Sequence, residues 1–470
     1  MGSFLTFFSQ GSAFSLLVRP GADALSFICP SLVYPSPSGE EGGSQFGSAP
    51  FPGGVGVGVN KVGGAVNTKG ATSRDTQPNT RAATDSPRHF PRGKTALALL
   101  VFLFSCSTSP AQQFALRGYV KNIQTFFFTD QENSLLSSGF VHNRLAFQWS
   151  PDSLTGLHAE MRNRLFYGDL VRVSPLFAEE LSRDPGYFDL SFNTIERNAL
   201  VMNSAFDRLY IEYRPGRWRF RAGRQRVNWG IATTWNPNDL FNAYNFLDFD
   251  YEERPGADAL RAEYQLGGFS HVEAVFSPSR QSRAWIGGAR YTGHRGSYDW
   301  QLIGAYFKNR LAIGGGWAGD LGRTGFKGEW TVFQPLDTGK TTLSFTLGSD
   351  YLFGKNWLLN GAVLWNTRAS GAVQSPETLA GATLSPDNLF PARLSMTLGL
   401  RKEITPLLNG SLALVYAPDA KMLIALPSFA VSVADNWTAD LTGQLFFGQS
   451  PAGNFGNRFN AVYARWRWSF

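Results

Sequence analysis

The run Ala461-Val462-Tyr463-Ala464-Arg465-Trp466-Arg467-Trp468-Ser469-Phe470 alternates between two kinds of side chain. Successive side chains of a β-strand point to opposite faces. Trp466, Trp468 and Phe470 would therefore share one face, and Arg465 and Arg467 the other. A strand of a membrane barrel has such faces, because one side meets lipid and the other meets a wet lumen. The run favours a membrane-spanning strand over its alternative, the edge strand of a soluble sandwich.

The aromatic residues of this run also resemble the C-terminal signal of bacterial outer-membrane barrels. We therefore expect Trp466, Trp468 and Phe470 to act as a membrane-insertion signal that the barrel-assembly machinery reads. In that setting, outer-membrane lipid and lipopolysaccharide would surround the apolar faces of the strands.

The composition fits a chain that is apolar on one face only. Aromatic residues make up 14% of the 470 residues, and there are 50 glycines. No stretch approaches the ~18 consecutive apolar residues of a membrane-spanning helix, which excludes a helical membrane protein. The arginines alternate with apolar residues instead of forming a basic run, so we expect no nucleic-acid partner.

An apolar run at 96–104 has the length of a signal-peptide core. Basic residues precede it at 88, 92 and 94, and the small residues Ser109-Pro110-Ala111 follow it. Residues 94–111 are therefore predicted to be a signal peptide that is cleaved before Gln112. This predicts export to the outer membrane of a Gram-negative cell.

Residues 1–93 precede the predicted signal peptide and are rich in Gly, Ser and Pro. A disordered leader and a start codon assigned too far upstream both explain them. We favour the second, because no methionine occurs between Met1 and Met161. Both cysteines, Cys29 and Cys106, lie before the predicted cut, which removes disulfides, zinc–cysteine sites and cysteine catalysis from the mature chain.

Residues 112–470 consist of alternating segments of ~10 residues separated by turn-forming residues, as the tilted strands of a barrel require. We predict an all-β fold, a transmembrane antiparallel up-and-down β-barrel of eighteen strands, with sixteen as the alternative. The predicted strands cover 114–128, 139–150, 155–168, 205–214, 217–227, 257–266, 269–279, 283–294, 297–308, 311–319, 324–334, 341–352, 357–367, 391–402, 407–417, 421–432, 437–447 and 458–470.

The connections between these strands differ in length according to their order. Even-numbered connections are short, whereas the three long ones, at 169–204, 228–256 and 368–390, are all odd-numbered. Long extracellular loops and short periplasmic turns are the known asymmetry of outer-membrane barrels. The connection lengths therefore support the barrel independently of the alternation.

Charged side chains recur on one face of several predicted strands. A lone arginine that faced lipid at mid-depth would cost ~2–4 kcal/mol, so we expect this face to line the lumen. Two roles remain open: paired charges that stiffen the wall, and a field that orders charged solutes in a water-filled pore. The predicted lumen residues are Arg162, Arg164, Arg208, Glu212, Arg217, Arg219, Arg221, Arg261 and Glu263.

The third predicted outward loop, at 228–256, holds more apolar side chains than a solvated loop needs. We expect it to fold into the barrel, where its acidic residues would approach the lumen arginines. Such a constriction with acidic and basic walls would act as a selectivity device. The predicted constriction residues are Trp229, Trp235, Asp239, Phe241, Asp248, Asp250, Glu252, Glu253 and Arg254.

Four motifs mark residues 223–261: Gly223-Arg224-Gln225, Trp229-Gly230, Trp235-Asn236-Pro237-Asn238-Asp239-Leu240-Phe241, and Glu253-Arg254-Pro255-Gly256-Ala257-Asp258-Ala259-Leu260-Arg261. Together they resemble a stretch of poorly characterised porin-like outer-membrane barrels, which are broadly similar to substrate-specific and alginate-export-type porins. The resemblance implies passive passage of small or anionic solutes through a monomeric or trimeric barrel. It does not name the solute.

Other functions fit the sequence less well. The acidic residues Asp248, Asp250 and Glu252 match no EF-hand spacing, so we expect no metal and no cofactor. A membrane hydrolase needs a nucleophile and a histidine at the lipid-facing rim, whereas His142 and His158 fall on predicted lumen positions, so we expect no enzyme. We expect a channel for small hydrophilic solutes, with a non-conducting, surface-organising barrel as the alternative.

Overall fold

The computed structural model describes residues 4–5, 8–9, 12–13, 16–17, 113–129, 135–242, 256–369, 384–449 and 453–470. Four two-residue strands, β1 (Phe4–Leu5), β2 (Phe8–Ser9), β3 (Ser12–Ala13) and β4 (Leu16–Leu17), form the pairs β1–β4 and β2–β3. They fall within the predicted leader. The predicted signal peptide, 94–111, lies outside the described residues.

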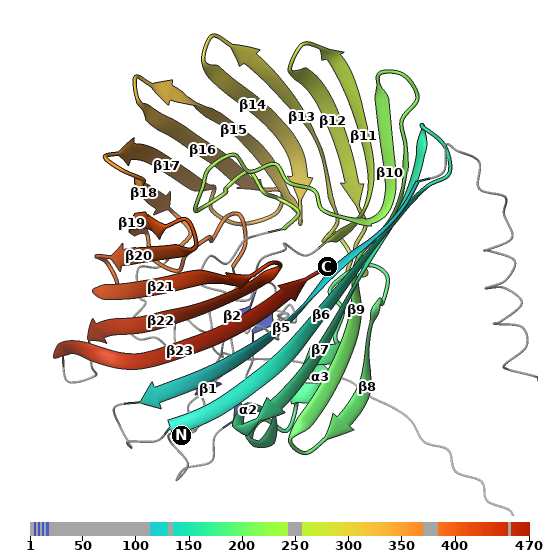
Figure 1. Cartoon of the computed structure of the whole chain (residues 1–470). Coiled ribbons are helices and arrows are strands. Elements are labelled where there is room, and N and C mark those ends of the chain that lie inside the picture. The colour runs from blue at the N-terminus through green and yellow to red at the C-terminus, as the bar shows by residue number, and fades with distance from the viewer. Residues whose placement is uncertain are drawn as a thin grey trace, which may run out of the picture. The chain divides into compact units, whose positions relative to one another are not determined.

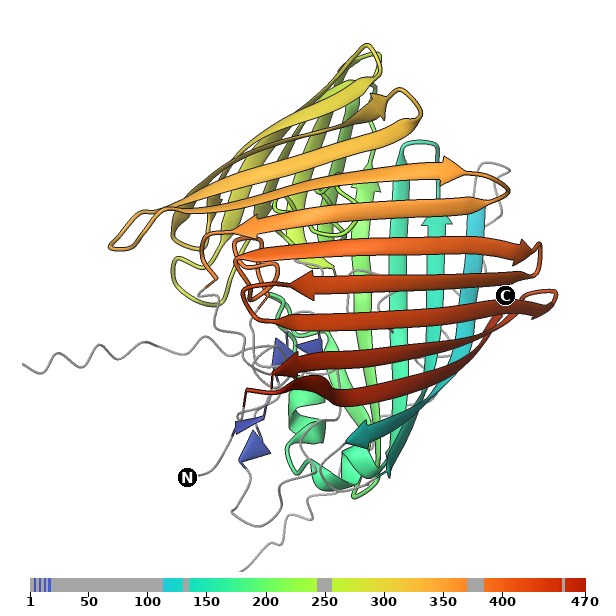
Figure 2. The same ribbon diagram turned by 90° about the vertical axis from the view of Figure 1, so that its left-hand side faces the viewer.

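Eighteen strands from residue 113 onward form a closed antiparallel barrel, as predicted (Figure 1). The barrel strands are β5 (Gln113–Thr129), β6 (Leu135–Ser150), β7 (Thr155–Gly168), β9 (Leu200–Tyr213), β10 (Trp218–Gln225), β11 (Ala257–Gly267), β12 (Ser270–Ser277), β13 (Ile286–Arg295), β14 (Tyr298–Phe307), β15 (Arg310–Leu321), β16 (Thr324–Pro335), β17 (Thr342–Phe353), β18 (Trp357–Asn366), β19 (Leu394–Thr405), β20 (Leu408–Ala417), β21 (Met422–Ala434), β22 (Trp437–Gln449) and β23 (Phe455–Ser469). Figure 2 shows the strands from β17 onward, in orange to red, running side by side.

The barrel closes through the pairing of its last strand, β23, with its first, β5. Beyond the end of β23, Phe470 and Gly118 exchange two backbone hydrogen bonds of 2.9 Å. We call the rim that holds Phe470 the terminal rim. Because neighbouring strands are antiparallel, the connections after β7, β10 and β18 lie at the opposite rim, which we call the loop rim.

The two faces of the wall differ as the alternation predicts. On β10, Trp218 and Phe220 are 45% and 40% exposed on the outer face. On β14, Leu302 is 54% exposed whereas its neighbour Gln301 is buried. Exposed apolar side chains recur on the outer face of every part of the wall, including Ile211, Leu260, Phe276, Ile313, Trp365, Leu398, Leu441, Trp466, Trp468 and Phe470. An apolar belt of this kind suits a lipid surrounding.

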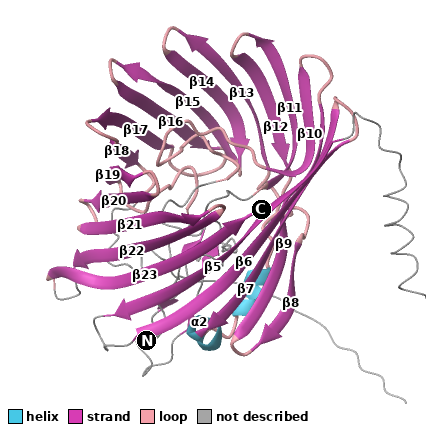
Figure 3. Ribbon diagram, in the orientation of Figure 1, coloured by secondary structure: helices cyan, strands magenta, loops and turns pink. Residues whose placement is uncertain are grey.

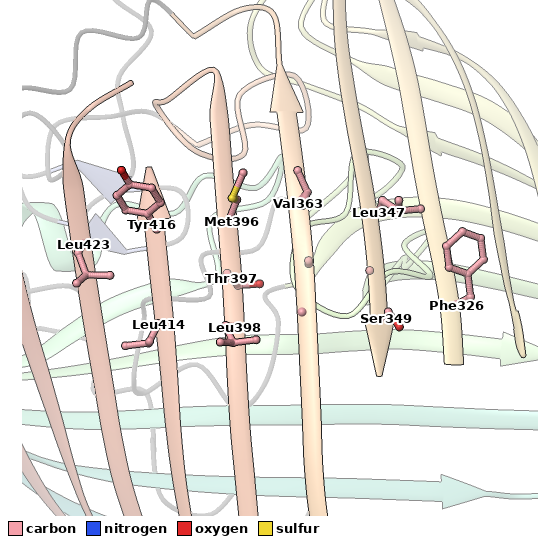
Figure 4. A pocket seen from close by; sticks show the side chains of 13 residues that line it. Phe326, Leu347, Ser349, Val363, Met396, Thr397, Leu398, Leu414, Tyr416 and Leu423 are labelled. Atoms are coloured by element: carbon pink, nitrogen blue, oxygen red, sulfur yellow. The ribbon is translucent and has the colours of Figure 1, made fainter. Parts of the chain in front are cut away.

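The outer face also carries a shallow apolar hollow of about 570 Å³ across β16–β21 (Figure 4). Its lining includes Val363, Met396, Leu398 and Tyr416, each at least 38% exposed. These side chains alternate with buried lumen residues such as Leu364. The hollow therefore faces away from the lumen and lies outside any solute pathway through the barrel.

The long connection predicted at 169–204 contains more structure than expected. It forms the short helices α2 (Asp169–Val173) and α3 (Phe177–Ser182), which are the two helices of the described residues (Figure 3). An additional strand, β8 (Ser191–Arg197), pairs with β9, which begins at Leu200 instead of 205. No helix among the described residues is long and apolar enough to cross a membrane.

The early start of β9 depends on a bulge that alternation alone does not reveal. Glu160 of β7 pairs with Arg208, but the next residue, Met161, pairs with Phe206. Asp207 is thus the extra residue, and both Asp207 and Arg208 are buried. A bulge turns two consecutive side chains toward one face. The sequence before residue 207 therefore alternates out of phase with the sequence after it.

Candidate functional site: the barrel lumen and its inward loops

The third outward loop enters the lumen directly after β10 and crosses the inside of the ring of strands (Figure 1). Trp229 is fully buried against the inner faces of β11–β16, and its ring meets Phe241 edge-on at 5.0 Å. Trp235, 1% exposed, belongs to another cluster that includes inner-wall residues of β18, β20 and β21 and also Phe390. The loop thus contacts two separate parts of the wall.

A single buried carboxylate on β16 holds the first turn of this loop. Glu329 is completely buried and accepts hydrogen bonds from the backbone N–H groups of Ile231 and Ala232. It also accepts the backbone N–H of Asn238 and the side-chain amide of Asn236, both at 3.2 Å. Four donors from one loop converge on one carboxylate, so the loop and the wall complete each other's hydrogen bonding.

Other wall residues fix the loop on either side of Glu329. The Thr331 hydroxyl donates to the Pro237 carbonyl at 3.0 Å, and the Asn238 amide donates to the Gly315 carbonyl at 2.9 Å. On β14, the Gln301 amide donates to the Trp229 carbonyl at 2.6 Å. Polar wall residues thus satisfy backbone groups that would be costly to bury alone.

Two glycines of the motifs allow this path. Gly223 has a φ of +117°, and a Cβ there would lie 2.3 Å from the Leu209 carbonyl oxygen. A Cβ on Gly230 would lie 2.7 Å from the side chain of Asn236, which it would push away from Glu329. Both positions therefore need glycine for the chain to turn inward.

A ladder of alternating charges crosses the inner faces of β9–β13. Its first carboxylate is Glu212, 1% exposed, which accepts Nε–H of Arg221 at 2.5 Å and of Arg214 at 2.6 Å. Arg219 lies 3.7 Å from the same carboxylate and 3.4 Å from Glu263. Three arginines thus share Glu212.

The ladder continues to the third loop through two further carboxylates. Arg261 links Glu263 at 3.1 Å to Glu273 at 2.9 Å. Glu273 is completely buried and also binds Arg290 at 2.6 Å and the indole N–H of Trp229 at 3.0 Å. We call this set the charge ladder: Glu212, Arg214, Arg219, Arg221, Arg261, Glu263, Glu273 and Arg290.

A second charged cluster surrounds the bulged residue Asp207. Arg144 donates to Asp207 at 2.9 Å and to Glu160 at 2.5 Å, and Arg162 lies 3.4 Å from Asp207. Arg208 donates to the Asp207 carbonyl oxygen at 2.8 Å. Of the other predicted lumen residues, Arg164 donates to Asn203 at 3.4 Å, and Arg217 is exposed beside the β9–β10 turn.

Two more segments of the loop rim pack against lumen-facing side chains. This inward packing was not predicted from the sequence. Phe177 and Leu181 of α3 are buried in a cluster with Ile123, Phe127 and other inner-wall residues of β5–β7 and β23. After β18, Phe390 lies 6.4 Å from the ring of Trp235. The third loop is therefore one of three inward segments, and its residue Trp235 meets one of the others.

The remaining predicted site residues are placed as follows. Asp239 is completely buried in the loop, while Asp248, Asp250, Glu252, Glu253 and Arg254 lie outside the described residues. The arginines Arg219, Arg221 and Arg261 bind wall glutamates. The described ranges contain no group of three or more His, Cys, Asp or Glu side chains that could hold a metal ion. Trp468 stacks on Trp437 and contacts Phe470.

Several residues that hold the site were missing from the predicted set, chiefly Glu329, Asp207 and Arg224. Glu329 had a readable signal, because it shares the lumen phase of β16 with Thr331 and Phe333. A carboxylate at that phase in a largely uncharged wall needs a partner. The sequence gives no such signal for Asp207, because the bulge changes the phase of the alternation at that residue.

No protein-family model matches the chain, and no curated protein matches it either. Solved structures do resemble it. They include the outer membrane channel DcaP of Acinetobacter baumannii, with 12% identity over 77% of this chain and 99% of that chain and a TM-score of 0.41. OccK11 of Pseudomonas aeruginosa has 8% identity over 76% and 96% of the two chains, with a TM-score of 0.47. OmpF of Salmonella typhi, solved with daunomycin, has 8% identity over 77% and 98%, with a TM-score of 0.42.

Proposed function

We propose that the chain is a porin-like channel of the outer membrane, through which small hydrophilic solutes, preferentially anions, diffuse passively. The observation that carries the proposal is a closed barrel with an apolar outer belt and a charged inner wall. Hydrogen bonds to this wall hold a loop inside the lumen. In this proposal the third outward loop forms the constriction, and the charge ladder sets the charge preference.

The charge of the ladder supports a preference for anions. It holds five arginines against three glutamates, so its charges do not cancel. Arg214, Arg219 and Arg221 have 48%, 40% and 22% of their side chains exposed, so their charge can act on a solute in the lumen. Arg290, at 12%, is largely screened by Glu273 and the loop. A basic wall concentrates anions and repels cations.

Placement in the outer membrane follows from the same features. The outward face of the barrel is apolar around the ring, and a closed barrel leaves no unpaired strand edge in lipid. In this setting, Trp466, Trp468 and Phe470 would insert the last strand, and the loop rim would face outward.

The test is single-channel conductance of the full chain in planar bilayers, beside a variant in which a short Gly-Ser linker replaces 231–252. We expect stable conductance with an anion preference, and a larger, less selective conductance in the variant. Silence from both proteins, after each has been shown to be folded by its heat-dependent mobility on gels, would overturn the channel proposal.

One observation favours a second candidate, a barrel that organises the cell surface without conducting. Three segments of the loop rim pack inward, and Trp235 and Phe390 meet within the lumen. If these segments close the lumen, the intact protein would be silent and current would occur only after the loop is replaced. The conductance pair therefore separates the two candidates.

A further inference from the structure

Arg224, the central residue of the Gly223-Arg224-Gln225 motif, uses every hydrogen-bond donor of its guanidinium group. Nε donates to Asp258 Oδ1 at 2.8 Å, and Nη2 donates to Asp258 Oδ2 at 2.9 Å and to the Phe188 carbonyl at 2.8 Å. Nη1 donates to Asp184 Oδ2 at 2.6 Å and to the Phe206 carbonyl at 3.3 Å. An arginine has five N–H donors, and all five are used here.

This arrangement is buried on all sides. The side chains of Arg224, Asp184 and Asp258 are 7%, 3% and 2% exposed. A Cβ on Gly186 would lie 2.1 Å from Arg224 Nη2, so only glycine lets the backbone approach the guanidinium so closely. An ion pair in such surroundings is far less screened by salt than a surface pair.

The partners of Arg224 come from three places in the chain. Arg224 is the penultimate residue of β10, just before the third loop leaves the wall, and Asp258 lies at the start of β11 where that loop returns. Asp184 belongs to the second loop, between α3 and β8. The guanidinium therefore joins both ends of the third loop to each other and to the second loop.

The second loop is itself shaped for this contact. Asp184 accepts the backbone N–H groups of Gly186 and Leu190, both at 2.8 Å, so its carboxylate organises the turn that carries it. The next turn docks as well, because the Phe188 N–H donates to Asp258 Oδ2 at 2.9 Å. Beside these contacts, Arg280 donates to the Tyr187 carbonyl at 2.9 Å.

We propose that Arg224, Asp184 and Asp258 form a clasp that couples the second outward loop to the third, so that the position of the third loop in the lumen depends on the second. The inference rests on the proposed function only in so far as the third loop is the constriction. The three residues of the clasp are positioning residues, because they act on the lumen through the loops. The coupling is a property of the fold that does not require ion flow.

The test reads the position of the third loop directly. In the full chain with Cys29 and Cys106 changed to Ser, Leu240→Cys places the one thiol at a side chain that is 2% exposed in the loop. The rate at which a water-soluble maleimide labels this thiol reports how often the loop leaves its position. Asp184→Ala removes the second-loop contact, and Arg224→Lys keeps the charge but removes the paired contact with Asp258.

We expect both changes to raise the labelling rate by about tenfold or more, because each breaks a buried ion pair. Asp189→Ala is the matched control, because Asp189 is an exposed residue of the same segment whose carboxylate accepts only the Ser191 N–H, at 3.4 Å, among the described contacts. It should leave the rate unchanged. Heat-dependent gel mobility checks that each variant is folded, and Asp184→Asn replaces Asp184→Ala if that variant fails.

An unchanged rate in folded Asp184 variants would overturn the coupling, even if Arg224→Lys raises the rate, because the clasp would then serve the third loop alone. Failure of the channel proposal gives a different result: the wild-type barrel would be silent in bilayers while the labelling rates still respond to Asp184. The two failures are therefore distinguishable.

Discussion

Glu329 and Asn238 lie 91 residues apart in the chain, and the carboxylate of Glu329 accepts the backbone N–H of Asn238 at 3.2 Å. The same carboxylate also accepts backbone N–H groups at Ile231 and Ala232. The turn between these residues therefore takes its shape from a wall residue on β16. A buried carboxylate so surrounded by donors acts as a template for the loop.

Replacing Glu329 with Ala should loosen the third loop. The change leaves three backbone donors without their acceptor, at a cost of about 1–3 kcal/mol each, which is enough to populate undocked loop conformations. We expect noisier and larger single-channel currents. Glu329→Gln should have a smaller effect, because its carbonyl oxygen still accepts from the loop.

Glu403→Ala is the control for this prediction, because Glu403 is an exposed residue near the end of β19 at the terminal rim, where it accepts the Asn356 amide. It removes the same charge without touching the loop. If folded Glu329→Ala gave currents with the noise and amplitude of the wild type, the loop would not depend on this carboxylate.

The barrel itself was predictable from the sequence because its physics is local. Each strand must alternate between lipid and lumen, and a pattern such as Trp218-Arg219-Phe220-Arg221 records that alternation directly. All eighteen predicted strands have counterparts in the structure. The start of β9 was wrong by five residues, because the bulge at Asp207 shifts the phase of the pattern.

The lumen contacts were harder to predict because they join residues that are distant in the chain. The apolar character of Trp229 and Trp235 predicted that they would be sheltered, and both are buried. Their specific neighbours depend on where the loop crosses, which no local pattern encodes. Likewise, the ladder arginines were identified, but their pairing with wall glutamates such as Glu273 depends on the strand register.

Trp235→Ala should widen the constriction. Trp235 packs in a cluster with Phe390, Leu389 and Met422, and its loss would remove the contact between two inward segments. Truncating a buried tryptophan costs about 3–5 kcal/mol. We expect higher conductance and faster passage of larger uncharged solutes in liposome-swelling assays. Trp365→Ala, on the outer face of β18 and 50% exposed, should change neither.

Changing Arg217, Arg219 and Arg221 together to Ser should shift the ion selectivity toward cations. Arg219 and Arg221 supply positive charge to the lumen beside Glu212, and their loss would leave that carboxylate without two of its partners. The reversal potential in a salt gradient measures the shift. A matched triple change of Arg295, Arg323 and Lys355, in exposed terminal-rim turns, removes equal charge outside the ladder. Equal shifts from both triples would mean that the ladder is not the filter.

Docking of α3 should weaken as the pH rises. Glu180 of this helix is 8% exposed, and burial raises its pKa to about 7 from an ordinary value of 4.5. The docked helix therefore keeps a proton that the undocked helix releases, and docking loses stability between pH 4.5 and about 7, by at most about 3 kcal/mol. Hydrogen exchange of α3 amides, corrected for its intrinsic pH dependence, should accelerate across this window in the wild type.

Glu180→Gln should abolish this acceleration, because the amide cannot ionise, and should protect α3 at pH 8 as well as at pH 5. Glu179→Gln is the control, because the Glu179 side chain is 68% exposed on the same helix. The wild-type pH profile should persist in that variant. A profile that survives in Glu180→Gln would assign the pH dependence to another group and leave Glu180 without a role in docking α3.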